Sequence, residues 1–112
     1  MPLPPEDSSY VTRVLFDWDE HNIAHIAVHS VSPEEAEQVV LGDPLELGFN
    51  PDANGEERWT YLGETNHGRI LQVIITMRGE KIRVVTAYDA ERQDKRLYLE
   101  TKAGWNDGFE SS

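Results

Sequence analysis

Two groups of side chains in this sequence could act on an anionic ligand, one of arginines and one of histidines. The arginines fall in or at the ends of predicted hairpin strands, and they are Arg58, Arg69, Arg78 and Arg83. A guanidinium presents forked donors that match two phosphate oxygens at once. The alternative is cross-strand pairing with Glu56, Glu57, Glu64 or Glu80, worth about 0–1 kcal/mol per exposed pair. From the residues alone both interpretations stay open.

The histidines recur at every fourth position, as His21, His25 and His29, so one helix face carries all three imidazoles. Two histidines at i and i+4 can share a metal ion, but no zincin-like carboxylate completes such a site here. A third histidine one turn further on reaches the same ion poorly. The sequence therefore predicts a polar helix face rather than a metal centre, with His29 at the helix end. The chain has no cysteine, which excludes disulfides, thiolate ligands and cysteine nucleophiles.

Aromatic residues near the basic positions also have two interpretations. Trp59 and Tyr61 alternate onto one face of a predicted strand, where they stack on nucleic-acid bases or, as we expect, pack in the core. Tyr88 ends the last predicted strand, where it takes part in a site or caps the core.

Charge is distributed unevenly along the 112 residues, whose net charge is −11. Residues 1–57 contain thirteen Asp and Glu and one base, Arg13, whereas residues 58–102 contain nine Lys and Arg against six acids. Electric fields act at the scale of a cleft, so a local basic surface can attract an anion despite the net charge. The acidic total argues against general coating of nucleic acid. We therefore expect an anionic partner to be bound on one face only.

The elements that must position these residues form one small α+β domain over residues 11–102, between flexible tails at 1–10 and 103–112. A strand is expected over 11–17, then a helix that Asp19 caps and that runs to about His29, burying Ile23, Ile26 and Ala27. The strongest local signal is a helix over 33–41, with Ser32 and Glu35 as a capping box and Gly42 as its end.

The second half of the chain predicts antiparallel strands over 45–49, 58–63, 70–77 and 81–87, and a last helix that Asp89 caps and that ends near Glu100. In the last strand we expect Ile82, Val84 and Thr86 on one face and Lys81, Arg83, Val85 and Ala87 on the other. The last helix carries three bases on one face, Arg92, Lys95 and Arg96. No apolar run is long enough for a membrane span and no secretory signal is evident, so a cytoplasmic protein without membrane contact is expected.

Seven short motifs in this order resemble the BrnT-like toxin family. They are Phe16-Asp17-Trp18-Asp19, His29 to Ala36, Asp43-Pro44-Leu45, Gly55-Glu56-Glu57-Arg58 with Gly63, Gly68 to Val73, Arg78 to Ala87, and Arg92 to Tyr98. The chain departs from the family pattern at Val28 and Ser30, where the family has Lys and Gly, and at Tyr88, where it has Arg.

The resemblance implies a fold similar to RelE-type toxins, with two N-terminal helices and one C-terminal helix on a mainly antiparallel sheet of four to five strands. It implies a metal-independent endoribonuclease without cofactor, whose partners are an RNA substrate and a small DNA-binding antitoxin of a type II toxin–antitoxin pair. The expected assembly is a homodimer or a toxin–antitoxin hetero-oligomer. His29, Arg83 and Tyr88 would then be catalytic, and the phosphate-binding residues would be Arg58, Arg69, Arg78, Arg92 and Arg96.

The departures and the acidic charge also support an alternative. In it, the same scaffold has attenuated nuclease activity and serves as a protein-binding module. Growth arrest on over-expression separates the two hypotheses, because only an active nuclease is toxic.

Overall fold

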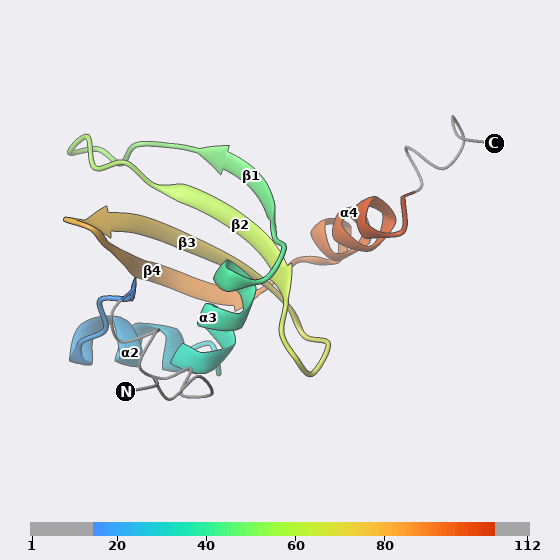
Figure 1. Ribbon diagram of the computed structural model, residues 1–112, viewed down its shortest axis with the longest axis horizontal. Helices are drawn as coiled ribbons and strands as arrows, with labels where there is room; N and C mark the ends of the chain where they lie inside the picture. Colours follow the sequence, from blue (N-terminus) through green and yellow to red (C-terminus); the bar gives the residue numbers. More distant parts are fainter. Residues whose placement is uncertain (1–14, 105–112) are drawn as a thin grey trace, which may run out of the picture.

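The computed structural model describes residues 15–104, which form a four-stranded antiparallel sheet with three helices (Figure 1). In chain order the elements are α2 (Glu20–Ala27), α3 (Pro33–Leu41), β1 (Leu45–Phe49), β2 (Trp59–Glu64), β3 (Ile70–Arg78), β4 (Lys81–Asp89) and α4 (Arg92–Lys102). The strands neighbour one another in the order β1-β2-β3-β4. The predicted α+β class, with two helices before the sheet and one after it, is confirmed. The N-terminal tail and residues 105–112 lie outside the described residues.

The main core lies between one face of the sheet and the helices α2 and α3, which Figure 1 shows side by side under the sheet. It is made of Phe16, Ile26, Val31, Ala36, Val39, Leu71, Val73, Ile75, Val84 and Ala87. Trp59 and Tyr61 pack against this cluster from β2. Their predicted packing role is therefore confirmed.

The helix α3 has the bounds that its capping signals predict. The Ser32 hydroxyl accepts a bond from the Glu35 N–H at 3.2 Å, and the Glu35 carboxylate accepts one from the Ser32 N–H at 3.0 Å. Trp18 donates its indole N–H to Glu37 at 2.8 Å, which joins the segment before α2 to this helix. Burial raises the pKa of Glu37, and the bond from Trp18 partly offsets this effect.

The helix α2 differs from its prediction in its buried face and in its length. Asp19 is the N-cap, as expected, but the helix ends at Ala27. Asn22 and Ile26 are buried, whereas Ile23 is 40% exposed. The reason is a polar contact that apolar periodicity does not encode. The Asn22 amide donates to the carbonyl of Val84 on β4 and to that of Asp17, which turns this side of α2 toward the sheet.

The predicted strand over 11–17 is reduced, in its described part, to a single bridge. Phe16 pairs in parallel with Ile82, and the Asp17 N–H donates to the Ile82 carbonyl at 2.8 Å. Residues 11–14 of the prediction lie outside the described part of the chain.

The last strand, β4, contains a β-bulge that changes which residues share a face. Ile74 pairs with Thr86 and Ile75 with Val84, so Val85 is an extra residue on β4. Beyond the bulge the alternation is shifted by one position, and Ala87 joins Val84 in the core. The expected grouping of Thr86 with Ile82 and Val84 is therefore wrong, because strict alternation holds only for an unbulged strand.

The C-terminal helix α4 begins after Glu91, its N-cap, and not at Asp89. Asp89 is instead the last residue of β4. Tyr98 of α4 packs with Leu62, Ile70 and Ala90 in a second, smaller cluster. Leu62 lies between Tyr61 and Gly63 on β2, so this cluster covers a corner of the sheet face opposite α2 and α3. Within residues 15–104, no helix has both the length and the apolar character that crossing a bilayer requires.

Candidate functional site

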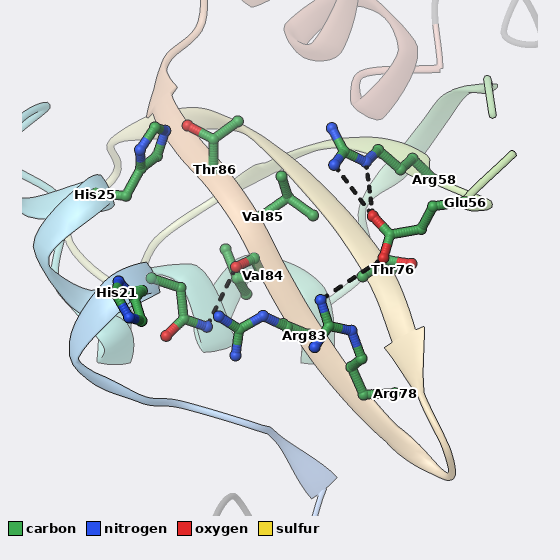
Figure 2. A pocket seen from close by; sticks show the side chains of 11 residues that line it. His21, His25, Glu56, Arg58, Thr76, Arg78, Arg83, Val84, Val85 and Thr86 are labelled. Carbon is green, nitrogen blue, oxygen red and sulfur yellow. Dashed lines mark hydrogen bonds and ion pairs between the residues drawn. The ribbon is translucent and has the colours of Figure 1, made fainter. Parts of the chain in front are cut away.

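A cleft of about 450 Å³ lies where the end of the sheet meets the helix α2 (Figure 2). Residues of α2, of the loop before β2, and of β3 and β4 contribute to it. It is lined by His21, Asn22, His25, Glu56, Arg58, Thr76, Arg78, Arg83, Val84, Val85 and Thr86. The cleft therefore brings together three of the predicted arginines with two of the histidines.

Arg58 and Arg78 share one carboxylate, that of Glu56. The Arg58 guanidinium donates to one Glu56 oxygen at 3.1 and 3.2 Å, and Arg78 lies 3.7 Å from the other. Figure 2 shows Glu56 between the two arginines. Arg58 also lies 3.4 Å from Asp52. The Arg78 side chain is 55% exposed, so its charge is the one in the cleft most open to solvent.

Arg83 is held more firmly, because its side chain is only 13% exposed and contacts two carboxylates. It lies 3.0 Å from Asp19 and 3.4 Å from Asp17. The hydrogen bond from Arg83, helped by the Asn22 backbone N–H, lowers the pKa of Asp19 from its ordinary 3.8 to about 2. Asp19, with Asp17, in turn raises the pKa of Arg83 above its usual value. Arg83 thus joins the start of α2 to β4 as well as lining the cleft.

His21 and His25 reach the cleft from successive turns of α2, and both side chains are exposed. The capping box at Asp19 and the Asn22 bond to β4 fix the rotation of this short helix, which aims positions 21 and 25 at the sheet edge. The sequence predicts that these two histidines lie on a polar helix face and gives them no role in a site. Their i, i+4 spacing indicates that they share one helix face, but the sequence does not show which surface of the molecule this face adjoins.

Arg69 lies in a different place and does not line the cleft. Its guanidinium contacts the carboxylates of Asp89 (2.9 Å) and Glu35 (3.1 Å) and the carbonyls of His29 (3.1 Å) and Ser30 (2.6 Å). The bond to Asp89 is the main reason why the pKa of Arg69 is raised, and the same contact lowers that of Asp89. Arg69 thus ties the turn after α2 to α3 and to the end of β4. The structure does not bring it to the other predicted phosphate ligands.

His29 and Tyr88 contact each other outside the cleft lining. Their ring centroids are 5.7 Å apart, and the Tyr88 hydroxyl accepts a bond from the Gln72 amide at 2.8 Å. The His29 ring also meets the His25 ring, at 6.1 Å between centroids. A row of rings therefore leads from the predicted His29–Tyr88 pair to the cleft. Arg92 and Arg96 lie on α4, which projects from the end of the sheet farther from α2 (Figure 1), and Arg96 pairs with Glu100 at 2.9 Å.

The cleft combines groups that suit a phosphodiester. Guanidiniums stabilise charge on phosphate oxygens, and imidazoles and carboxylates transfer protons near neutral pH. Among residues 15–104, no three His, Asp or Glu side chains are grouped so that they could hold a metal ion. The guanidiniums of the cleft are able to supply electrostatic stabilisation, and its imidazoles and carboxylate are able to transfer protons.

One comparison with known proteins agrees with this chemistry. A family model described as "Ribonuclease toxin, BrnT, of type II toxin-antitoxin system" matches residues 18–94, a span that includes the residues lining the cleft. A search of curated proteins found no match for the chain.

Proposed function

We propose that this chain, which belongs to the BrnT family of ribonuclease toxins of type II toxin–antitoxin systems, cleaves RNA in the cleft between α2 and the sheet. The observation that carries the proposal is the convergence of Arg58, Arg78 and Arg83 with two imidazoles in one open cleft. Elsewhere in the described chain, Arg69 is hydrogen-bonded to the turn after α2. Arg92 and Arg96 lie on a separate helix, α4.

The proposed reaction is metal-independent transesterification. The 2′-hydroxyl of a ribose attacks the neighbouring phosphorus, and the guanidiniums stabilise the charge that develops on the phosphate oxygens. A base must take the 2′-hydroxyl proton and an acid must protonate the leaving 5′-oxygen. Both kinds of group line the cleft, which supports this course of reaction.

One observation favours the alternative of an attenuated scaffold that binds protein. Each cleft arginine already pairs with carboxylates, namely Asp52, Glu56, Asp17 and Asp19. RNA must compete with these partners. The pairs of Arg58 and Arg78 are partly exposed and worth only about 0–1 kcal/mol each, so a phosphate dense in charge can displace them. We therefore favour the nuclease.

The test is cleavage of a single-stranded RNA by the purified full-length protein in excess chelator. We expect cleavage that stops when the ribose at the cut carries no 2′-hydroxyl. The double variant Arg58→Ala/Arg78→Ala should cut RNA at least roughly a hundredfold more slowly, because each charged contact is worth about 1.5–3 kcal/mol. The matched control is Arg92→Ala/Arg96→Ala, which removes two arginines outside the cleft and should retain activity. Intact RNA with freshly purified wild-type protein would refute the proposal.

A type II system also implies a protein antitoxin as partner. We propose that it is a small DNA-binding protein encoded by a neighbouring gene and that it covers the cleft. Co-expression should abolish growth arrest and yield a stable complex without RNA cleavage. A complex that forms with a toxin that never cuts RNA would favour the binding-module alternative.

A further inference from the structure

We infer that Glu56 is the general base and His25 the general acid of the cleavage, an assignment that rests on the function proposed above. Both line the cleft, and they come from opposite sides of it: Glu56 from the loop before β2, and His25 from α2 (Figure 2). The arginines of the cleft lie with them. Neither residue is among those that the sequence singled out for catalysis.

The loop that carries Glu56 is ordered by its own hydrogen bonds. The Asp52 carboxylate accepts from the N–H groups of Asn54 (2.9 Å) and Glu56 (2.8 Å), and the Asp52 N–H donates to the Glu56 carbonyl at 2.9 Å. The Thr76 hydroxyl of β3 donates to the Glu57 carbonyl at 2.7 Å. These bonds hold the Glu56 backbone against the sheet, so its side chain starts from a fixed point beside the cleft and can leave the arginines when a phosphate enters. A backbone fixed in this way favours the role of a catalytic base.

Glu56 occupies the position that a phosphate would take between Arg58 and Arg78. One of its oxygens contacts Arg58 and the other faces Arg78. When a phosphate enters and engages the two guanidiniums, the carboxylate loses its partners and lies beside a second anion. Substrate binding thus frees the carboxylate from both arginines, and it can then accept a proton from the sugar beside that phosphate.

His25 is preferred to His29 as the acid because it reaches the cleft. It is exposed, and its ring contacts that of His29, which limits its orientation. The other charged groups lining the cleft are His21, Arg58, Arg78 and Arg83, and of these only His21 is an imidazole able to replace His25.

In the proposed step, two proton transfers accompany the exchange of one bond at phosphorus. The 2′-oxygen gives its proton to the Glu56 carboxylate and forms a bond to phosphorus, while the bond from phosphorus to the 5′-oxygen breaks. The leaving 5′-oxygen takes the proton of the His25 imidazolium. The products are a 2′,3′-cyclic phosphate and a 5′-hydroxyl, and the protein is left with protonated Glu56 and neutral His25. Water returns one proton to His25 and removes one from Glu56.

The experiment compares variants of the full-length protein, in which Glu56→Gln and His25→Ala remove the assigned groups and His21→Ala removes the other imidazole of the cleft. The controls are Glu57→Gln, one residue along the same loop, and His67→Ala, an exposed histidine in the turn before β3; neither residue lines the cleft. Cleavage of an RNA oligonucleotide is measured across pH. Affinity is measured for the same oligonucleotide with 2′-deoxy sugars, which binds but is not cut.

We expect Glu56→Gln and His25→Ala to cut about 10²–10⁴-fold more slowly than wild type, and the controls to cut as wild type does. The acidic limb of the pH profile should disappear in Glu56→Gln and the alkaline limb in His25→Ala. Glu56→Gln should bind the deoxy oligonucleotide at least as tightly as wild type, because it removes a negative charge from the cleft. A group that only holds the arginines in place would instead weaken binding when removed.

Several results would overturn the assignment while leaving the proposed function intact. One is a Glu56→Gln variant that stays active and keeps both limbs of its pH profile. Another is a Glu56→Gln variant that loses affinity for the deoxy oligonucleotide together with activity. A third is an alkaline limb that disappears in His21→Ala and remains in His25→Ala. If Glu56→Gln does not fold, Glu56→Ala removes the carboxylate without placing an amide between the arginines. Full activity in Glu56→Ala would then refute the base role. A wild-type protein that leaves RNA intact would refute the proposed function itself, and this assignment with it.

Discussion

At the scale of single residues, burial of the guanidinium separates two uses of arginine in this protein. Arg83 and Arg69 are 13% and 25% exposed, and each bridges segments that are distant in sequence. Arg78 is 55% exposed and meets a single carboxylate at 3.7 Å. A charge withdrawn from water depends on its partners, whereas an exposed one exchanges partners at little cost. Ligand binding is therefore expected to depend most on the exposed Arg78 and folding on Arg69, while Arg83 takes part in both.

Replacement of Arg69 by alanine is expected to lower the free energy of unfolding by roughly 2–4 kcal/mol, because it leaves Glu35, Asp89 and two carbonyls without their donor. Arg69→Lys should recover only part of this loss, since an ammonium cannot reproduce the forked contacts. Urea unfolding measures both. Arg92→Ala, at an exposed position of α4, is the control and should change stability by no more than about 0.5 kcal/mol. An Arg69→Ala protein of wild-type stability with weakened RNA affinity would instead restore Arg69 as a phosphate ligand.

The contact between Asp19 and Arg83 predicts a dependence of stability on pH. The folded pKa of Asp19, about 2, lies below its ordinary 3.8, so the contribution is complete above about pH 4 and is lost as the pH falls toward 2. Asp19→Asn keeps a good N-cap but does not titrate, so its free energy of unfolding should fall less steeply between pH 4 and 2. Urea unfolding at several pH values tests this. The exposed neighbour variant Glu20→Gln should follow the wild-type curve, and an unchanged slope in Asp19→Asn would contradict the prediction.

At the scale of elements, the site depends on how closely helices approach the sheet. The Asn22 bond to Val84 holds α2 against the β4 edge, where it forms one wall of the cleft. The bulge at Val85 keeps Ala87 in the core while Thr86 lines the cleft with Arg83. On the other side, α3 approaches β2 at Gly63, where a Cβ atom would lie 2.8 Å from Val39 and 3.3 Å from Pro44. Close contacts at these points set the position of each element relative to the cleft.

Gly63→Ala is therefore expected to destabilise the protein by about 1–3 kcal/mol, because the new methyl group overlaps the Val39 side chain of α3 and forces the helix away from the sheet. Gly48→Ala in β1 is the matched control. There a Cβ would meet only the Asn50 amide, at 3.5 Å, an ordinary contact. Thermal unfolding of both variants tests the difference. Equal midpoints would show that α3 accommodates a methyl group at Gly63.

At the scale of the whole molecule, a small cleft lined by three arginines lies in a protein of net charge −11. The described residues before Arg58 include many acids and no base, and they form α2, α3 and β1. A single RNA strand bound as proposed would therefore meet the three arginines in the cleft and repulsion around it. This balance should make binding local and dependent on few phosphates.

Salt dependence measures the number of phosphates that the cleft neutralises. With three arginines, the logarithm of the association constant should fall with the logarithm of salt concentration at a slope of about −2, since each phosphate contact on a single strand contributes about −0.7. Arg78→Ala should make the slope shallower by about 0.7, whereas Arg92→Ala should leave it unchanged. Fluorescence anisotropy with a 2′-deoxy oligonucleotide gives these slopes. A slope much steeper than −2 would mean that RNA contacts cations beyond the cleft.

The sequence by itself determined the class of fold, the bounds of α3 and β1, and the family. The bounds of α3 depend on a local signal, the Ser32–Glu35 capping box, and the sheet pairs each strand with its neighbour in the chain. The family is indicated by short motifs in a fixed order. Only the tertiary structure decided which charged groups meet. Arg69 and Arg83 look alike along the sequence, yet one fastens a turn and the other lines the cleft. Ion pairs such as that of Arg83 with Asp19 join residues 64 positions apart. Their formation depends on helix rotation, on a single bulge and on one buried amide, and periodicity along the chain encodes none of these.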